Sequence, residues 1–563
     1  MKNIERKLFV TLIILFVCDT FLFSQNSKAQ SNTSSVQEST EVFVFPACKY
    51  NRLNGKNTPL VIEKKEKVKL RMCTGQIQSF TLLLSTQKKL RDIQLKWNPF
   101  KGNGNSLKAS AMDVHIAKVW YQAGISINEV NKKILTQELL LNNDSIIQID
   151  TIQKINYLLV KDLFNKKKYI DISSPNASVP SDVIIEDSPV FLPFHMDEKT
   201  NKQLWFRIEI PENTLPGTYN TFIMISSKEG EIKSIPVEVE VLPFQLDESR
   251  LLYGIYYHGV LAEEGYKKKP FHWSYKSRNQ LILELQDLKK HGIKYPSLYC
   301  KYEMLEEELA IRKTLQFPMD KLFQLGLRTS NPQSESGIDS LKKAIQMWKE
   351  KVEKLGVLHL YVYGIDEAKD AKLRSERAAW NAVHESGASV FVSVNPYAYK
   401  DVADILDVAI SRAKPTRIQA DAYHKNNGLI LSYANPHTGE ENPEVYRRNY
   451  GLVIWKSGYD GYFDYAYQKG HGTIWNDFDS PAHRDQVFTY PSSNGLMNTI
   501  QWEGFREGVN DTRFLSTLLN RTEKLKASGK NVEAAESFIE SIDPSGDLDQ
   551  IRDAIIDQIL ILQ

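Results

Sequence analysis

The sequence predicts a multidomain protein, with an N-terminal all-β sandwich followed by a (β/α)8 TIM-like barrel and C-terminal helices. Residues 41–245 contain short strand-type runs separated by turn signals, with almost no helical periodicity. Strand-type and helix-type segments then alternate over about 270 residues, the length of an eight-fold barrel. The chain has 563 residues and 42% apolar side chains, which is enough for several packed cores.

The first 29 residues have the pattern of a secretory signal peptide. An apolar run over residues 8–23 follows three basic residues, Lys2, Arg6 and Lys7. Basic residues before a short apolar run are typical of an export signal. A spanning helix needs ~20 apolar residues, more than this run supplies, and Asp19 interrupts it. We therefore expect no stable membrane span.

Small residues favour cleavage after Ser24 or before Gln30. With the second site, residues 30–40 form a linker and the mature protein is exported to the periplasm, the cell surface or the medium. Anchoring as a lipoprotein through Cys18 is a minor alternative, because residues 15–18 loosely resemble a lipobox.

Charge and cysteine content limit the classes of partner. The chain has 71 Lys+Arg against 69 Asp+Glu, a net charge of +2, and no long run of one sign, so no nucleic-acid partner is expected. Cys48, Cys73 and Cys300 follow the signal without C-x-x-C or paired histidine spacing, so neither a metal nor another cofactor is predicted. Buried free thiols are favoured over a Cys48–Cys73 disulfide.

The predicted sandwich covers residues 41–245. Its strand-type segments, several of which alternate apolar with polar residues, are 41–45, 78–84, 204–210, 219–225 and 235–241. Pro216-Gly217 supplies a corner before one strand, and Lys228-Glu229-Gly230 predicts a hairpin between the last two. These patterns favour sheet-on-sheet packing.

The predicted barrel covers residues 246–520, and a helical extension follows over 521–563. Strands are expected at 251–257, 295–299, 359–365, 388–394 and 429–433, and helices at 276–291, 337–355, 371–386 and 444–456. The final helices are expected at 502–519, 532–541 and 548–562. A doubly wound open sheet is the alternative, but no glycine-rich phosphate loop follows the first strand.

Reactive groups of such barrels project from the carboxyl ends of the strands. The segment His359–Glu367 ends in Gly-Ile-Asp-Glu, which places Asp366 and Glu367 side by side at that edge. Two neighbouring carboxylates tend to separate into one protonated and one ionised group, as glycoside hydrolysis requires. The alternative is a structural role, in which Asp366 caps the next helix and the dipole of that helix favours the charge of Glu367.

Aromatic and polar residues stand at several other predicted strand ends. Sugars present flat C–H faces and hydroxyl rims, so aromatic platforms combined with amide, carboxylate and imidazole groups suit them. The candidate substrate-binding residues are Tyr363, His258, Asn395, Tyr433, Tyr462, Trp475 and Asp477. The alternative role of any single aromatic residue among them is core packing. The alternative for His258 is a structural histidine satisfied by a backbone hydrogen bond at a strand end.

With these motifs collected, the chain resembles glycoside hydrolase family 123 and related glycoside-hydrolase-like proteins. The resemblance covers most of the mature chain and rests on the order of six segments: 210–219, 363–367, 455–461, 475–477, 490–491 and 502–511. It implies an exported β-N-acetylgalactosaminidase with a β-sandwich, a (β/α)8 barrel and a catalytic Asp-Glu pair. Glu367 would be the acid/base and Asp366 would orient the 2-acetamido group of the substrate.

The chain departs from this family at one place, because Ala368 and Lys369 follow the pair where many related sequences have proline. This bears on the substrate more than on the reaction class. The expected function is release of a β-linked N-acetylhexosamine from a glycan by substrate-assisted retaining hydrolysis. Two alternatives remain, a non-catalytic glycan-binding protein, and a glycosidase for sugars without an acetamido group that uses a second carboxylate such as Asp421. The sequence indicates no oligomeric state.

Overall fold

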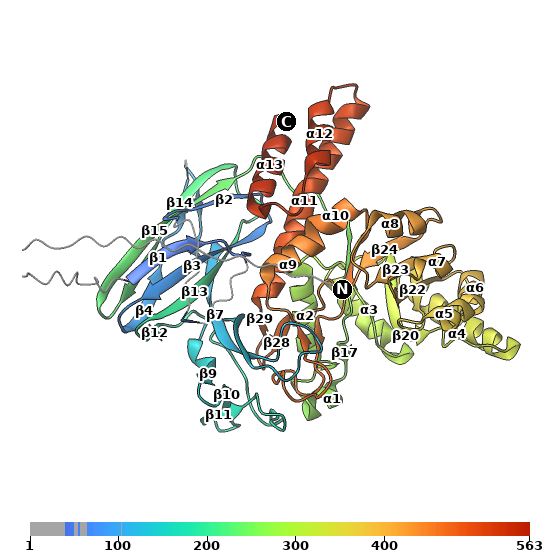
Figure 1. Ribbon diagram of the computed structural model, residues 1–563, viewed down its shortest axis with the longest axis horizontal. Helices are drawn as coiled ribbons and strands as arrows, with labels where there is room; N and C mark the ends of the chain where they lie inside the picture. Colours follow the sequence, from blue (N-terminus) through green and yellow to red (C-terminus); the bar gives the residue numbers. More distant parts are fainter. Residues whose placement is uncertain (1–39, 50–54, 57–64, 103) are drawn as a thin grey trace, which may run out of the picture. The chain divides into compact units, whose positions relative to one another are not determined.

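The computed structural model describes residues 40–49, 55–56, 65–102 and 104–563 (Figure 1). The predicted signal peptide, Cys18 and residues 30–39 of the predicted linker lie outside this part of the chain. Within it, no helix is both long and apolar enough to cross a bilayer. Cys48, Cys73 and Cys300 are buried free thiols, as predicted.

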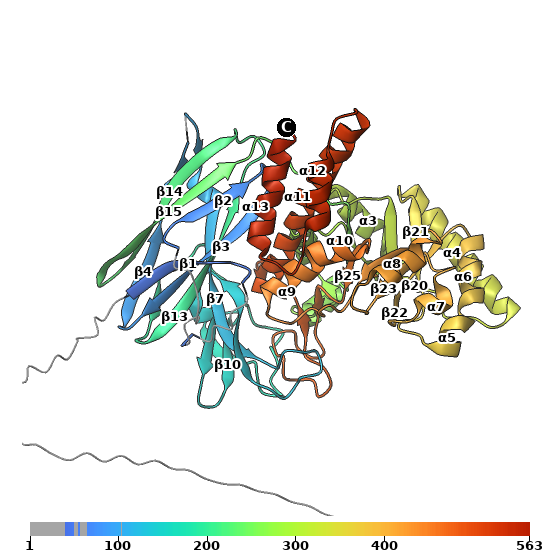
Figure 2. The same ribbon diagram turned by 45° about the horizontal axis from the view of Figure 1, so that its top comes forward.

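The N-terminal half contains two larger sheets that share one apolar cluster (Figure 2). The first has the order β1 (Thr40–Phe45), β3 (Ile77–Thr86), β13 (Thr200–Glu209), β7 (Met112–Gln122) and β8 (Ile134–Leu141). The main path of the second runs through β12 (Phe194–Met196), β4 (Leu90–Lys96), β14 (Gly217–Ser227), β15 (Gly230–Val241) and β2 (Val68–Met72). Leu82 and Phe206 of the first sheet and Ile223 and Val237 of the second belong to the shared cluster.

Alternating side chains explain why these segments form strands. Along β14 every second residue from Tyr219 to Ile225 is buried, and its neighbours are exposed. This period of two is what a sheet with one apolar face requires. The predicted hairpin is confirmed, because Ser227 pairs with Gly230 across Lys228 and Glu229.

Eight parallel strands follow and form a nearly closed barrel, which confirms the expected TIM-like arrangement of this half. In chain order they are β16 (Leu252–Ile255), β19 (Tyr295–Pro296), β20 (Lys321–Arg328), β21 (His359–Tyr363), β22 (Ser389–Val394), β23 (Val408–Ser411), β24 (Leu429–Ser432) and β25 (Gly461–Asp464). β16 pairs with β25, and a parallel bridge between Leu298 and Gln324 joins the β19 segment to β20.

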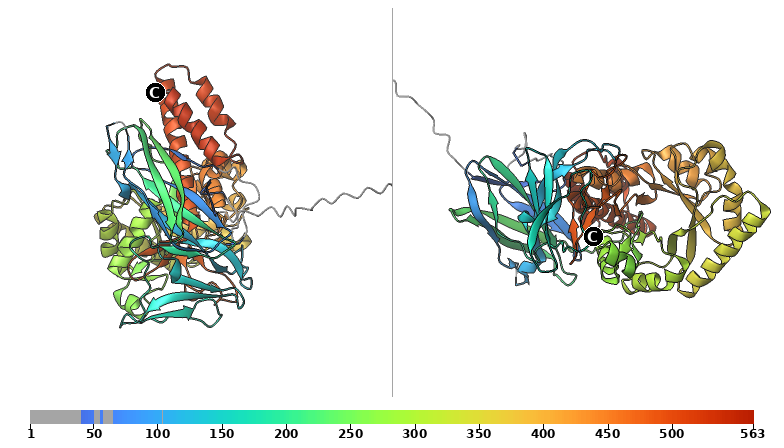
Figure 3. Two further views of the ribbon diagram at one scale, coloured as in Figure 1. Left: turned by 90° about the vertical axis from the view of Figure 1, so that its left-hand side faces the viewer. Right: turned by 90° about the horizontal axis from the view of Figure 1, so that it is seen from below.

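Helices cover the outside of the barrel strands (Figure 3). They include α2 (Arg278–Lys290), α3 (Leu305–Thr314), α4 (Glu335–Lys354), α6 (Arg377–Glu385), α8 (Arg417–His424) and α9 (Pro443–Arg448). α4 buries Leu341, Ile345, Trp348 and Val352, a spacing of three to four residues that forms one apolar stripe.

The long helix α11 (Ile500–Ala527) is buried along most of its length, and α12 (Glu533–Ser541) and α13 (Leu548–Ile561) follow it. It continues across residue 520, where the sequence predicts a domain boundary. Three of its buried residues, Glu503, Glu507 and Asp511, are carboxylates spaced four residues apart, which places them on one helix face.

Cations and one backbone amide from four other elements satisfy these carboxylates. Glu503 lies 3.4 Å from Arg207 of β13, and Glu507 accepts the backbone N–H of Ser79 in β3 at 2.9 Å. Arg552 of α13 contacts Glu507 at 2.7 Å and Asp511 at 2.5 Å. Arg447 of α9 contacts Asp511 at 2.8 Å, and Arg506 of α11 itself contacts Glu503.

We predict that Asp511→Asn lowers the free energy of unfolding by about 3–5 kcal/mol, because Arg447 and Arg552 would stay buried without their shared counter-ion. Chemical denaturation measures this change. The matched control is Glu536→Gln, which removes the exposed partner of Lys526 and should cost less than about 1 kcal/mol. Equal effects of the two substitutions would contradict the prediction.

Candidate functional site

An aromatic layer fills the barrel below the carboxyl ends of its strands. The ring of Phe323 lies 5.1 Å from both Phe391 and Phe463. Gly254 of β16 makes room for this layer, since a Cβ there would lie 2.3 Å from the ring of Phe463. Tyr256 packs on Phe463 at 5.2 Å, one step closer to the strand ends. The barrel therefore has a packed floor, and chemistry is restricted to its carboxyl edge.

Asp366 and Glu367 follow β21 at this edge and point to different partners. Asp366 is exposed and accepts a hydrogen bond from the hydroxyl of Tyr363 at 2.6 Å. Glu367 is partly exposed, and its Oε2 lies 2.6 Å from Nη1 of Arg412, which follows β23. The two adjacent carboxylates thus lie in different surroundings, one beside phenols and one beside a guanidinium.

The backbone of Glu367 is held in an unusual conformation. Its φ is 47°, a value that residues other than glycine rarely adopt. The Glu367 N–H donates to the carbonyl of Ser393 at 3.0 Å, and the amide of Asn395 donates to the Glu367 carbonyl at 2.7 Å. Strain of this kind persists where neighbours enforce it and is frequent at functional sites. Asn395 therefore supports the turn that carries the pair.

A relay of two phenols fixes Asp366. The hydroxyls of Tyr256 and Tyr363 lie 2.9 Å apart, and Tyr363 donates onward to Asp366. Burial, followed by the charge of Asp366, raises the pKa of Tyr363 well above its ordinary value. Tyr363 therefore stays protonated and can donate its hydrogen bond to Asp366.

Aromatic side chains continue around the edge from these residues. His258 stacks on Tyr299 at 4.2 Å and meets Trp273 and Tyr465 edge to face at 4.9 and 5.2 Å. Tyr433 lies 6.2 Å from Tyr256. The edge thus combines two carboxylates with aromatic faces, a composition suited to a sugar ring.

His258 is neutral in this environment. Burial, and then the charges of Lys469 and Arg328, lower its pKa to about 3. Its Nε2 has no hydrogen-bond partner among the described residues. The predicted alternative, a histidine fully satisfied by backbone, therefore does not account for this nitrogen.

Six of the nine predicted site residues lie at this edge: Asp366, Glu367, Tyr363, His258, Asn395 and Tyr433. The sequence analysis missed five others there, namely Trp273, Arg328, Arg412, Tyr465 and Lys469. Arg412 directly follows a strand end, and this would have identified it had the four-residue strand β23 been recognised.

The predicted roles of Tyr462, Trp475 and Asp477 in sugar binding are corrected. Tyr462 is fully buried and points outward from β25, with Tyr450 at 4.4 Å and Phe505 at 4.7 Å. Trp475 is 1% exposed, and packs against Trp120 and Tyr490 in the apolar cluster that contains β8.

Asp477 has a structural role instead. Its carboxylate accepts the backbone N–H groups of Ala123 and Asp485, each at 2.8 Å, and pairs with Arg484 at 3.1 Å. Asp421, the alternative second carboxylate, lies on α8 with 66% of its side chain exposed and pairs with Arg417 of the same helix. Neither belongs to the barrel edge.

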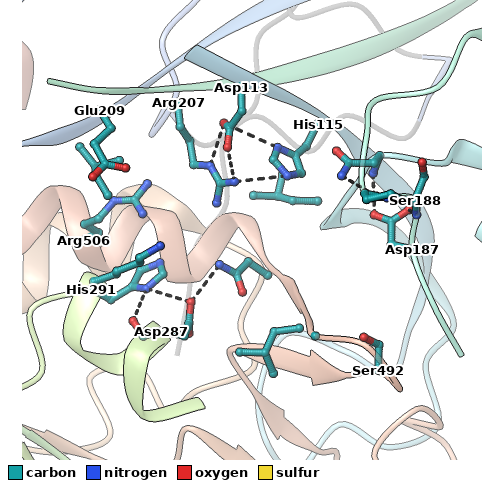
Figure 4. Close-up of a pocket in the computed structure, with 18 of the residues that line it drawn as sticks. Asp113, His115, Asp187, Ser188, Arg207, Glu209, Asp287, His291, Ser492 and Arg506 are labelled. Atoms are coloured by element: carbon teal, nitrogen blue, oxygen red, sulfur yellow. Dashed lines mark hydrogen bonds and ion pairs between the residues drawn. The ribbon is translucent and has the colours of Figure 1, made fainter. Parts of the chain in front are cut away.

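A polar cavity of about 430 Å³ lies elsewhere in the molecule, lined by residues of β7, β13, α2 and α11 (Figure 4). Three of the four carboxylates that line it are already engaged. Asp113 lies 2.6 Å from Arg207, Asp287 accepts the indole N–H of Trp502 at 2.8 Å, and Asp187 accepts backbone N–H groups. The barrel edge, where Asp366 remains exposed, is therefore the stronger candidate.

Within the described part of the chain, no three His, Cys, Asp or Glu side chains are grouped to hold a metal ion.

No family model and no curated protein sequence matches the chain. A solved family 123 glycoside hydrolase from Clostridium perfringens, studied for glycolipid glycan hydrolysis, is similar in structure with a TM-score of 0.66. The alignment covers 93% of this chain and 99% of that one at 12% identity. The resemblance predicted from the sequence is thus confirmed in the fold.

Two further glycoside hydrolases align with low scores. A family 2 β-galacturonidase from Eisenbergiella tayi has a TM-score of 0.32 at 7% identity, and the alignment covers 77% of this chain and 89% of that one. A family 5 xyloglucanase from Bacteroides ovatus has a TM-score of 0.27 at 7% identity, and the alignment covers 79% of this chain and 98% of that one. These scores carry no argument about this chain.

We predict that Trp475→Ala lowers the free energy of unfolding by about 3–5 kcal/mol, because it leaves a cavity in a buried cluster. Denaturant unfolding measures this. Tyr397→Ala, at a side chain that is 71% exposed, serves as the control and should change stability little. A Trp475 variant of normal stability would return this residue to the surface.

The pKa values of two histidines should be shifted in opposite directions from the ordinary value. His258 should remain neutral from pH 5 to 8, whereas the hydrogen bond to Asp407 raises the pKa of His384 above its ordinary value. The stability due to His384 is therefore complete below about pH 6.5 and is lost as pH rises through its folded pKa. That due to His258 is present above about pH 6.5 and is lost as pH falls toward 3. NMR titration of ¹³C-labelled histidines, assigned with His258→Asn and His384→Asn, measures both; a His258 midpoint above 5 would refute this.

Proposed function

We propose that the protein is an exported glycoside hydrolase that releases a β-linked N-acetylhexosamine, most specifically N-acetylgalactosamine, by substrate-assisted retaining hydrolysis. One observation carries the proposal: Asp366 and Glu367 are adjacent at the barrel edge, among aromatic side chains, and point to different partners. The shared fold with a family 123 glycoside hydrolase supports the same reaction class, and the N-terminal signal pattern supports export.

Adjacency favours an intramolecular nucleophile. An ordinary retaining glycosidase places its two carboxyls ~5 Å apart on opposite faces of the sugar, and neighbouring residues on one turn do not straddle a ring. Two other carboxylates are poorly placed to attack C1, because Asp421 lies on a helix surface and Asp464, the last residue of β25, is fully buried. The acetamido oxygen of the substrate can instead attack C1.

In this mechanism Glu367 donates a proton to the glycosidic oxygen as the bond from C1 to that oxygen breaks. The acetamido carbonyl oxygen forms a bond to C1 and gives an oxazolinium ion, while the aglycone leaves as an alcohol. Asp366, oriented by the hydrogen bond from Tyr363, stabilises the positive charge that develops on the acetamido nitrogen. Glu367 then accepts a proton from water as the water oxygen attacks C1, which restores the acetamido group and retains the configuration.

Arg412 adds one requirement to this scheme. Its guanidinium occupies Oε2 of Glu367 at 2.6 Å, whereas proton donation needs a carboxyl O–H directed at the glycosidic oxygen. Binding of the glycosidic oxygen must therefore separate Glu367 from Arg412, and the exposed Arg412 side chain has solvent to move into.

The two carboxylates should respond differently to substitution. Glu367→Gln should lower kcat/KM by about 10²–10⁴ on substrates with poor leaving groups and much less on activated aryl glycosides. Asp366→Asn should slow both kinds of substrate alike, and a thiazoline mimic of the oxazolinium ion should inhibit it less than the wild type. Asp421→Asn is the matched control and should retain wild-type rates.

The deciding measurement compares β-galactosides with and without the 2-acetamido group. Cleavage of only the acetamido sugar supports the proposal. Equal cleavage of both would mean that the acetamido group is not the nucleophile, and binding without any hydrolysis would favour the non-catalytic glycan-binding alternative.

A further inference from the structure

Two cations flank the barrel edge without a carboxylate partner of their own. Arg328 ends β20, and Lys469 belongs to the short strand β26 (Gln468–Lys469) that follows β25. Among the residues that the structure describes, neither has a carboxylate oxygen within 4.0 Å. Elsewhere on this edge Arg412 is paired with Glu367.

Both cations are held against aromatic rings of the candidate site. The ammonium of Lys469 lies 3.5 Å from the ring centre of Trp273, and the guanidinium of Arg328 lies 5.7 Å from that of Tyr363, the residue that binds Asp366. The Nε of Arg328 donates to the carbonyl of Leu325 at 3.1 Å, which fixes the start of the guanidinium group. These contacts therefore hold both cationic side chains in place at the barrel edge.

His258 lies near both cations. It stacks on Tyr299 and contacts Trp273, and the charges of Lys469 and Arg328 both act on its pKa. Its own ring is neutral and 9% exposed, and its Nε2 is unpartnered within the described residues. An unsatisfied buried nitrogen beside two unpaired cations indicates a ligand group that is absent from the protein itself.

Asp485, whose charge acts on the pKa of Lys469, is a weak counter-ion. Asp485 interacts with Lys469 at longer range, but its carboxyl accepts the backbone N–H of His471 at 2.7 Å, and burial raises its pKa well above the ordinary value. Lys469 thus retains its capacity to bind an anion.

We propose that the glycan bound at this edge carries an anionic substituent, a sulfate ester or a carboxylate, which binds between Arg328 and Lys469 against His258, Trp273 and Tyr299. The exposed guanidinium of Arg328 can bind such an oxyanion through two parallel hydrogen bonds, and the half-buried ammonium of Lys469 adds a second positive charge. This inference rests on the proposed function for the position of the sugar and adds to it a class of substrate.

The kinetic test compares three β-N-acetylgalactosaminides, one uncharged, one 6-sulfated and one with a uronic acid as aglycone. Wild-type kcat/KM should be highest for one of the two anionic substrates, and the choice between them identifies the source of the anion. In Arg328→Gln and in Lys469→Gln the ratio of anionic to uncharged kcat/KM should fall about tenfold. Lys456→Gln, which removes a lysine from the ring of Trp455 on another element, should leave the ratio unchanged.

A binding test separates this inference from the proposed reaction. Calorimetry with N-acetylgalactosamine 6-sulfate, glucuronic acid and unmodified N-acetylgalactosamine as probes requires no hydrolysis. Tighter binding of an anionic probe, weakened by both substitutions and by added salt, supports the anionic subsite even if no glycoside is cleaved. Equal binding of all three probes, or substitutions that weaken charged and uncharged probes by the same factor, would overturn it while leaving the hydrolase proposal intact.

Discussion

The buried carboxylates of α11 are the constraint on which the rest of the structure depends. Glu503, Glu507 and Asp511 repel one another along one helix face, and burial without counter-ions would cost several kcal/mol for each of them. The counter-ions come from β13, α9 and α13, so these elements must assemble on α11 together. A single helix thereby joins the N-terminal sheets, the barrel and the C-terminal helices.

This helix also positions the strands that carry the candidate site. Phe505 of α11 packs on Tyr253 at 5.7 Å and on Tyr462 at 4.7 Å, the outward faces of β16 and β25. The inward faces of the same two strands carry Gly254 and Phe463, which form part of the barrel floor. His258 and Tyr465 lie just past their carboxyl ends. The geometry of the barrel edge is thus coupled to an ion network on the opposite side of the strands.

The periodicity of the sequence predicted the barrel because parallel barrel strands are buried on both faces and leave clear apolar runs. It missed β20, β23 and β25. Missing β23 concealed Arg412. Trp475 and Asp477 were likewise assigned to a barrel strand end, although Trp475 packs on Trp120 and Tyr490, and Asp477 binds the backbone N–H groups of Ala123 and Asp485. Local pattern does not distinguish a buried aromatic residue from an exposed one.

The pair Asp366-Glu367 was predictable because two carboxylates after a strand are themselves a local signal, whereas their distinct environments depend on residues 3 to 110 positions away. Charge shows the same separation of scales. The whole chain is nearly neutral, at +2, which gives no reason to expect a polyanionic partner. Electrostatic interactions are screened over about 8–10 Å at ordinary ionic strength, so a site responds to its own few charges and not to that total. Around the barrel edge these include two cations without carboxylate partners beside a neutral imidazole, a local imbalance that only the folded chain brings together.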